Sequence, residues 1–189
     1  SKMAACSTCV QKAGSPVAAA ACAPCHNSLV ADTKGCLECA TKAKTAGDAV
    51  GCGECANTNN VLPGYTAMCH ECVLKAREPA KSYCYNTMTR IPVSPAATAV
   101  TKGYYQCLAG AKDQDSGQGC MFCYRGVVES PGDDGPSCYA CVNALPISFN
   151  ANSCSSCWSA ARKAKGKQCQ VCVASKPKGT YAFDCYGGR

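Results

Sequence analysis

The chain has 189 residues, of which 21 are cysteine, three are phenylalanine and one is tryptophan, and its formal net charge is +7. Cysteine at this level is typical of a disulfide scaffold or a metal-loaded protein. The composition excludes a fold held by a deep core of Leu, Ile and Phe, so cross-links, metal ions or a partner must stabilise the chain.

The motif Cys-x-x-Cys occurs nine times, for example in ACSTCVQKAG at 5–14 and GCLECATKAKTAG at 35–47. Within each half of the chain the pairs recur every 14 to 18 residues, which makes them an internal repeat. The copy at 36–43 places Cys, Cys, Ala and Ala at positions i, i+3, i+4 and i+7, which form one face of a helix.

The same apolar spacing recurs at 69–76, 138–145 and 154–161. Helix-favouring Lys and Ala often follow the cysteines, and then a break rich in Gly or Pro. Each repeat is therefore predicted to be two or three helical turns and a loop. Because such short helices are unstable alone in water, their cysteine faces must be fixed to their neighbours. The predicted fold is a small disulfide-rich protein of short α-helices and loops, arranged as an elongated, solenoid-like ladder in two modules.

A segment at 85–106 contains no cysteine and is rich in Pro, Thr and Ala, which is typical of a linker. We therefore predict a first repeat module at 1–84, a linker at 85–106 and a second repeat module at 107–189. Two equal modules on either side of a linker indicate an internal duplication.

Cysteine pairs of this kind have three uses. A thioredoxin-like redox protein needs one or two pairs beside a βαβ pattern, and this chain has nine pairs and no such pattern. Zinc is the stronger alternative, because two pairs separated by about 10 to 20 residues can supply four thiolate ligands. Nine pairs would hold four zinc ions but leave one pair and three single cysteines unused.

A disulfide ladder uses more of the cysteines. In one register, the second cysteine of each pair bonds to the first cysteine of the next pair, and the single cysteines begin or end the series. The enclosed loops contain 10 to 14 residues, which is ample to bring the Cα atoms to about 5.5 Å. Cys6 alone is left, either free or paired with an upstream segment. The predicted bonds are Cys9–Cys22, Cys25–Cys36, Cys39–Cys52, Cys55–Cys69, Cys72–Cys84, Cys107–Cys120, Cys123–Cys138, Cys141–Cys154, Cys157–Cys169 and Cys172–Cys185.

Other registers, such as bonds between the first cysteines of successive pairs, stay open because sequence does not prove connectivity. Beyond the cysteines, few residues indicate chemistry. His70 lies within CHEC and is expected at an exposed position between cross-links rather than at a metal. Tyrosine is enriched in the second half, where it either covers the disulfides or forms an interface. No phosphate-binding Gly-rich loop, nucleophile elbow or His-Glu metal motif is present, so we predict no catalytic or cofactor-binding residue and no enzyme.

The basic run RKAKGKQ at 162–168 lacks interleaved aromatic residues, so a solvated face is expected there rather than a nucleic-acid site. No apolar run approaches the ~20 residues of a membrane span. Disulfides at this density indicate an oxidising compartment, namely the cell exterior, the secretory pathway or a comparable lumen.

The motifs CLEC, CGEC, CHEC, CYAC, CSSC and CQVC, with spacers rich in Ala, Thr and Lys, resemble those of protist surface proteins. Both the variant-specific surface proteins of diplomonads and the immobilisation antigens of ciliates have this pattern, and the resemblance covers nearly the whole chain outside 85–106. It implies a surface coat or structural role without enzymatic activity. The Gly-Gly-Cys-Tyr element typical of the diplomonad family is absent.

Three functional hypotheses follow. The first is a disulfide-stapled structural or interaction protein, extracellular or lumenal, with protein partners in a surface, filament or membrane-associated assembly and with no cofactor and no nucleic acid. The second is a zinc-loaded module that binds nucleic acid or a protein in a reducing compartment. The third is an accessory subunit of a complex in an organelle lumen.

Overall fold

The computed structural model describes residues 2–27, 29–57, 61, 64–86, 95–129, 135–145, 152–160, 166–176 and 185. The chain forms two compact units, Ser1–Val93 and Ser94–Arg189. Among the described residues, helices are the only extended regular elements, and one isolated antiparallel bridge joins Val30 to Asn57. No helix in these ranges is both long and apolar enough to cross a membrane.

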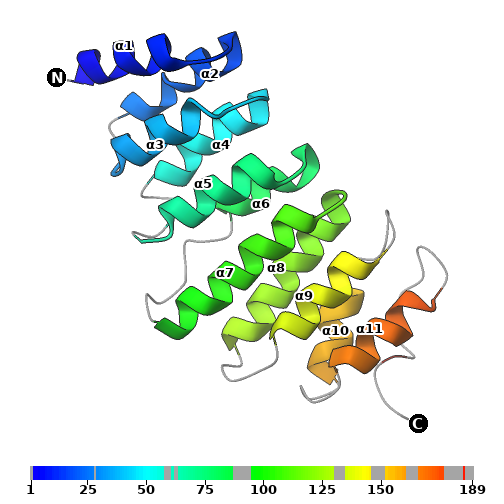
Figure 1. Ribbon diagram of the computed structural model, residues 1–189. Coiled ribbons are helices and arrows are strands. Elements are labelled where there is room, and N and C mark those ends of the chain that lie inside the picture. Colours follow the sequence, from blue (N-terminus) through cyan, green and yellow to red (C-terminus); the bar gives the residue numbers. More distant parts are fainter. Residues whose placement is uncertain are drawn as a thin grey trace. The chain divides into compact units, whose positions relative to one another are not determined.

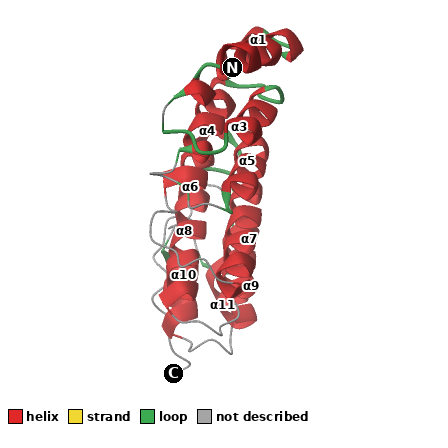
Figure 2. Ribbon diagram, turned by 90° about the vertical axis from the view of Figure 1, so that its left-hand side faces the viewer, coloured by secondary structure: helices red, strands yellow, loops and turns green. Residues whose placement is uncertain are grey.

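The helices of the first unit pack in two layers (Figure 1, Figure 2). One layer, the odd layer, contains α1, α3 and α5, and the other, the even layer, contains α2, α4 and α6. Each helix contacts its sequence neighbours in the opposite layer, so the chain alternates between layers as it advances. The elements are α1 Lys2–Lys12, α2 Pro16–Ala21, the 3-10 helix η1 Pro24–His26, α3 Thr33–Ala40, α4 Ala46–Ala56, α5 Thr66–Lys75 and α6 Glu78–Asn86.

The second unit repeats this arrangement with five described helices. In one layer α9 contacts both α7 and α11, and α8 and α10 contact each other in the other layer (Figure 1). Their bounds are α7 Pro95–Gly110, α8 Gln114–Glu129, α9 Gly135–Ala144, α10 Ser153–Ala160 and α11 Gly166–Ala174.

Local sequence signals explain where several helices begin. The Ser15 hydroxyl accepts a hydrogen bond from the Ala18 amide at 3.1 Å, and Pro16 occupies the first turn of α2. The Asp32 carboxylate likewise accepts from the Gly35 amide at 2.9 Å at the start of α3. These caps satisfy amide groups that have no partner within the helix.

The apolar faces predicted from the repeat spacing are buried. Both cysteines and both alanines of the 36–43 repeat are at most 4% exposed, and the corresponding residues at 69–76 and 138–145 are at most 5% exposed. The core of the first unit therefore consists largely of alanine and disulfide sulfur. The predicted fold class of short helices in a disulfide ladder is confirmed, whereas the elongated shape predicted for the whole chain stays a prediction.

One repeat and the predicted linker depart from the expected pattern. The CAPC motif at 22–25 does not form one helix: Cys22 ends α2, and Cys25 lies in η1. Pro24 separates them, because proline has no amide proton to donate and its ring clashes with the preceding turn. The predicted linker also contains helix, since α7 begins at Pro95; residues 87–94 lie outside the described part.

Candidate functional site

Ten disulfides connect the helices in series. The two cysteines of a helical Cys-x-x-Cys lie on one face, so the first bonds to the preceding element and the second to the next. The Cα atoms of the bonded residues are 5.5 to 6.0 Å apart, as disulfide geometry requires. The five bonds of the first unit are Cys9–Cys22, Cys25–Cys36, Cys39–Cys52, Cys55–Cys69 and Cys72–Cys84.

The five bonds of the second unit follow the same rule, and all ten pairs are those of the register described above. Most of these cysteines are fully buried, so the disulfides lie between the helix layers rather than on the surface. The bonds are Cys107–Cys120, Cys123–Cys138, Cys141–Cys154, Cys157–Cys169 and Cys172–Cys185.

Cys6 is a free thiol on α1, partly buried against the first core cluster. Cys6 precedes Cys9 by three residues. In the other helical Cys-x-x-Cys motifs, the cysteine at this first position forms the disulfide to the preceding element. In α7, which begins the second series, Tyr104 takes this position three residues before Cys107 and is completely buried. The two units thus begin differently, one with a thiol and the other with a phenol ring.

The described part of the chain contains no group of three or more His, Cys, Asp or Glu side chains placed to hold a metal ion. The paired cysteines cannot offer the thiolates that zinc requires, because their sulfur atoms are in disulfides.

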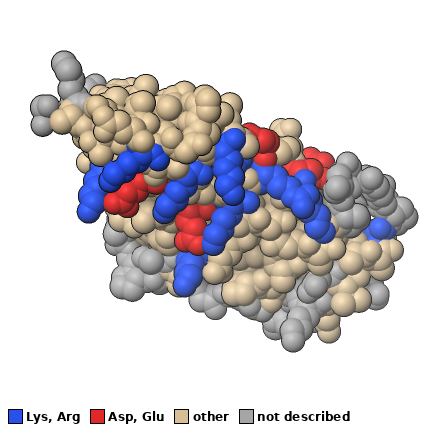
Figure 3. Space-filling view, turned by 45° about the horizontal axis from the view of Figure 1, so that its top comes forward, with Lys and Arg blue, Asp and Glu red and all other residues tan. Residues whose placement is uncertain are grey.

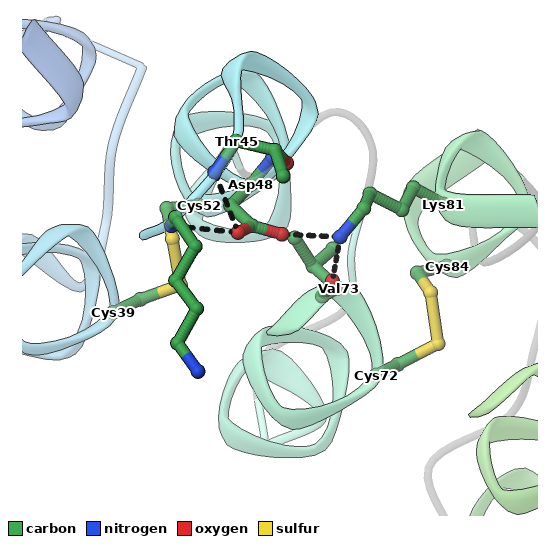
Figure 4. A network of polar contacts seen from close by, with 9 residues as sticks. Cys39, Thr45, Asp48, Cys52, Cys72, Val73, Lys81 and Cys84 are labelled. Atoms are coloured by element: carbon green, nitrogen blue, oxygen red, sulfur yellow. Dashed lines mark hydrogen bonds and ion pairs between the residues drawn. A yellow bond between two sulfur atoms is a disulfide. The ribbon is translucent and has the colours of Figure 1, made fainter. Parts of the chain in front are cut away.

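A buried ion pair joins α4 to α6 (Figure 4). The Lys81 ammonium donates to Asp48 Oδ1 and, at 2.8 Å, to the Val73 carbonyl of α5. The two side chains are 4% and 8% exposed for Asp48 and Lys81 respectively. This contact therefore connects three consecutive helices in the centre of the first unit, between the Cys39–Cys52 and Cys72–Cys84 bonds.

The Asp48 carboxylate also caps its own helix. Its Oδ2 accepts from the amides of Lys44 at 2.8 Å and Thr45 at 3.0 Å, and the Thr45 hydroxyl accepts from the Asp48 amide in return. Burial alone would raise the pKa of Asp48, but the hydrogen bond from Lys81, the two amides and the Lys81 charge together lower it. The Asp48 carboxylate therefore accepts three hydrogen bonds, all from groups of the scaffold.

His70 is buried, and the expectation that it would be exposed is wrong. It lies on α5, where it is 7% exposed, because its ring turns inward onto α4. Its Nε2 lies 3.1 Å from the Cys52 carbonyl, and since a carbonyl only accepts, Nε2 carries the proton. Burial lowers the pKa of His70, against the hydrogen bond to Cys52 and the charges of Asp32 and Glu38.

The tyrosines of the second unit that the structure describes form core rather than surface. Tyr104, Tyr105, Tyr124 and Tyr139 are at most 6% exposed. The Tyr104 ring lies 4.7 Å from Tyr124 and 5.6 Å from Tyr105, measured between centroids. These four side chains therefore pack inside the second unit and are not exposed on its surface.

Some predicted features lie outside the described residues, namely most of the basic run at 162–168 and the tyrosines near the end of the chain, Tyr181 and Tyr186. The Asp48–Lys81 pair was not predicted. The Thr45-x-x-Asp48 spacing is a capping-box signal, which indicates the bonds of Asp48 to the start of its own helix. No local pattern indicates Lys81, which lies 33 residues from Asp48.

Comparison with protein families, with curated proteins and with solved structures gives no match to the chain. The resemblance to protist surface proteins is therefore supported only at its coarsest level, that of a cysteine-rich repeat protein with Cys-x-x-Cys spacing.

Proposed function

We propose that this chain is a non-enzymatic structural or interaction protein of an oxidising compartment, where it serves as a subunit of a larger assembly. The observation that carries the proposal is the serial ladder of five disulfides in each unit, which bond helices that follow one another in the chain. A chain so fixed loses little conformational entropy when its surface binds a partner.

The buried polar groups of the first unit support a structural role. Asp48 and Lys81 bond to each other and to backbone groups at the start of α4 and in α5, and His70 donates to a backbone carbonyl. A catalytic acid, base or nucleophile must instead reach a substrate, usually in a cleft. These side chains are directed at the protein itself, so their chemistry serves the scaffold.

Ten intramolecular disulfides support an oxidising location, because cytosolic thiol systems keep such cysteines reduced. Within such locations, the cell surface or secretory pathway is our first choice, in keeping with the resemblance to protist surface proteins. Attachment to a complex in an organelle lumen is the alternative, and cell fractionation distinguishes the two.

The test starts from cells that make the protein, with a thiol-alkylating reagent added at lysis. We expect the denatured, non-reduced chain to carry one alkyl group, on Cys6, and to weigh about two mass units less for each disulfide than the reduced chain. We also expect a native particle much larger than the 19.5 kDa chain.

Alkylation of some twenty cysteines together with bound zinc would overturn the proposal and place the protein in a reducing compartment. A stapled chain that runs as a free 19.5 kDa monomer in mild extracts would overturn the assembly role and leave only the oxidising location.

A further inference from the structure

Charged side chains are divided unequally between the two layers of the first unit. The even layer carries Asp48, Glu54 and Glu78 and one cation, Lys81, which is already paired with Asp48. The helices of the odd layer carry the described cations Lys12, Lys34 and Lys75 and two carboxylates, Glu38 and Glu71. The loops that join the two layers add Lys42, Lys44 and Arg77, with the carboxylate of Asp32.

This cationic face is hollowed. Three hollows of about 560, 570 and 670 Å³ lie between α3 and α5, between α1 and α3, and beside the loops that follow these helices. They adjoin, because Lys34 and Glu38 line the first two, and Lys42 and Leu74 line the first and third. Together they form what we call the basic groove, lined by Lys12, Lys34, Lys42, Lys44, Leu37 and Leu74.

The carboxylates of the face are partly used within the protein. Glu71 forms an ion pair with Lys75 at 2.5 Å, and Asp32 caps α3. By contrast, Lys34 and Lys42 form no ion pair within 4.0 Å among the described residues. On the face drawn in Figure 3, Lys and Arg side chains lie near one another with carboxylates between them.

Helix stability does not explain all of these lysines. Lys12 and Lys75 end their helices, where a cation is favourable. Lys34 instead occupies the first turn of α3, and Lys44 immediately precedes the N-cap of α4. A cation is unfavourable at both positions because the helix dipole is positive there. Their presence beside the hollows is therefore better explained by a negatively charged partner.

The lining favours a protein over a polyanion such as nucleic acid or a sulfated polysaccharide. Polyanions are bound by uninterrupted cations, whereas here Glu38 lies between Lys34 and Lys42 along α3 and its flanking loop. The floor also contains Leu37 and Leu74, both half-buried. Apolar side chains next to separated cations match a segment that has its own apolar residues between carboxylates.

We infer that the basic groove is a docking surface for a partner protein that presents an acidic, amphipathic segment. The inference rests on the proposed function, since it names the surface through which the chain would join an assembly. The groove is held in shape by the bonds from Cys9–Cys22 to Cys55–Cys69, which connect its helices through the even layer. Little ordering is then needed on binding.

The experiment uses the oxidised full chain and a fluorescein-labelled synthetic helix-forming peptide in which Glu and Leu alternate at helical spacing. Fluorescence anisotropy measures affinity, and amide chemical shifts of the ¹⁵N-labelled chain locate the site. We expect shifts on α1, α3 and α5, and we expect affinity to fall with salt. The peptide with Gln in place of Glu should bind much more weakly.

Two matched variants distinguish binding by the basic groove from binding by the net positive charge of the chain. The groove variant is Lys34→Gln/Lys42→Gln, and the control is Lys102→Gln/Arg125→Gln, which removes the same charge from exposed positions of the second unit. The groove variant should weaken binding by about tenfold or more, while the control should stay near the wild type. Lys34→Gln relieves an unfavourable dipole contact, so the groove variant should fold as stably as the wild type.

Equal weakening by both variants would overturn the inference, as would shifts confined to the second unit. If the groove binds a heparin-type oligosaccharide in preference to the peptide, its partner would be a polyanion and the inference of a protein partner would be wrong. If the chain self-associates and the groove variant abolishes this, the occupant of the groove would be a second copy of the chain and not a different protein. If the peptide does not bind the basic groove but the disulfides are intact and the native particle is large, the docking inference fails and the proposed function stands. Failure of the inference is therefore distinguishable from failure of the proposed function.

Discussion

The Asp48–Lys81 pair is the contact on which a single residue change should have its largest effect. Replacing Lys81 by Met leaves the Asp48 carboxylate buried with two amide donors but without its cation. Breaking a buried pair from one side typically costs about 3–5 kcal/mol of unfolding free energy. We expect a loss of that order for Lys81→Met, measured by urea unfolding of the oxidised chain at neutral pH.

Two control variants show whether the unpaired charge causes the loss of stability. Asp48→Asn/Lys81→Met removes both charges while keeping an acceptor for the amides, so it should recover much of the lost free energy. Lys75→Met removes the cation of the exposed Glu71 pair and should change stability by about 0.5 kcal/mol or less. If the double variant were as unstable as Lys81→Met, lost packing of the lysine stem rather than the unpaired charge would be responsible.

His70 makes the stability of the first unit depend on pH. Its folded pKa lies below the unfolded value of about 6.5, chiefly because the ring is buried. Unfolding therefore takes up a proton between these two values, and the free energy of unfolding should fall as the pH is lowered from about 6.5 towards the folded pKa. Above about pH 6.5 the His70 ring is neutral in both states, and its contribution to the free energy of unfolding is fully present.

The measurement is a series of urea unfolding curves across this pH range for the wild type and His70→Gln. The Gln amide can donate to the Cys52 carbonyl as Nε2 does, but it does not titrate. The curve for His70→Gln should therefore be flatter between pH 6.5 and the lowered pKa. An unchanged slope would assign the pH dependence to other groups.

At the scale of the helices, the repeat spacing was enough to predict which faces are buried. Cys36, Cys39 and Ala40 show why: a three- and four-residue period forces them onto one side, and the disulfides require that side to face inward. The inward turn of His70 could not be predicted in this way, because it depends on the Cys52 carbonyl of another helix. Local patterns report a residue's own helix, whereas partners in a neighbouring helix depend on how the layers pack.

Close approach of neighbouring helices depends on residue size. A Cβ atom added at Gly51 of α4 would lie 2.5 Å from Cγ1 of Val73 on α5, and both residues are buried. Alanine at this position gains about 1 kcal/mol in helix propensity but forces the two helices apart, and overpacking typically costs about 1–3 kcal/mol. We expect Gly51→Ala to lower the free energy of unfolding.

Gly14→Ala is the matched control for this change. No atom lies within 4 Å of a Cβ built at Gly14, which is in the loop before α2, so the substitution should be neutral or slightly stabilising. Denaturant midpoints of both variants are compared with the wild type. A Gly51→Ala protein as stable as Gly14→Ala would show that the α4–α5 contact adjusts without loss.

At the scale of the whole chain, each of the two compact units has its own five disulfides and its own core. Alanine and sulfur dominate the first core, whereas the second adds four tyrosines and Trp158 to its disulfides. The single tryptophan of the chain is 2% exposed on α10, so its fluorescence reports on the second unit alone.

This probe tests whether loss of a disulfide acts locally. Cys39→Ala/Cys52→Ala removes the central bond of the first unit, and such a loss typically costs about 2–5 kcal/mol. We expect the helical signal of the first unit to be lost at lower temperature, while the Trp158 transition stays where it is in the wild type. In the mirror variant, Cys141→Ala/Cys154→Ala, the Trp158 transition itself should move. A Trp158 shift of equal size in both variants would mean that the ladders unfold as one cooperative body, because stability in a stack of repeats passes only between elements in contact.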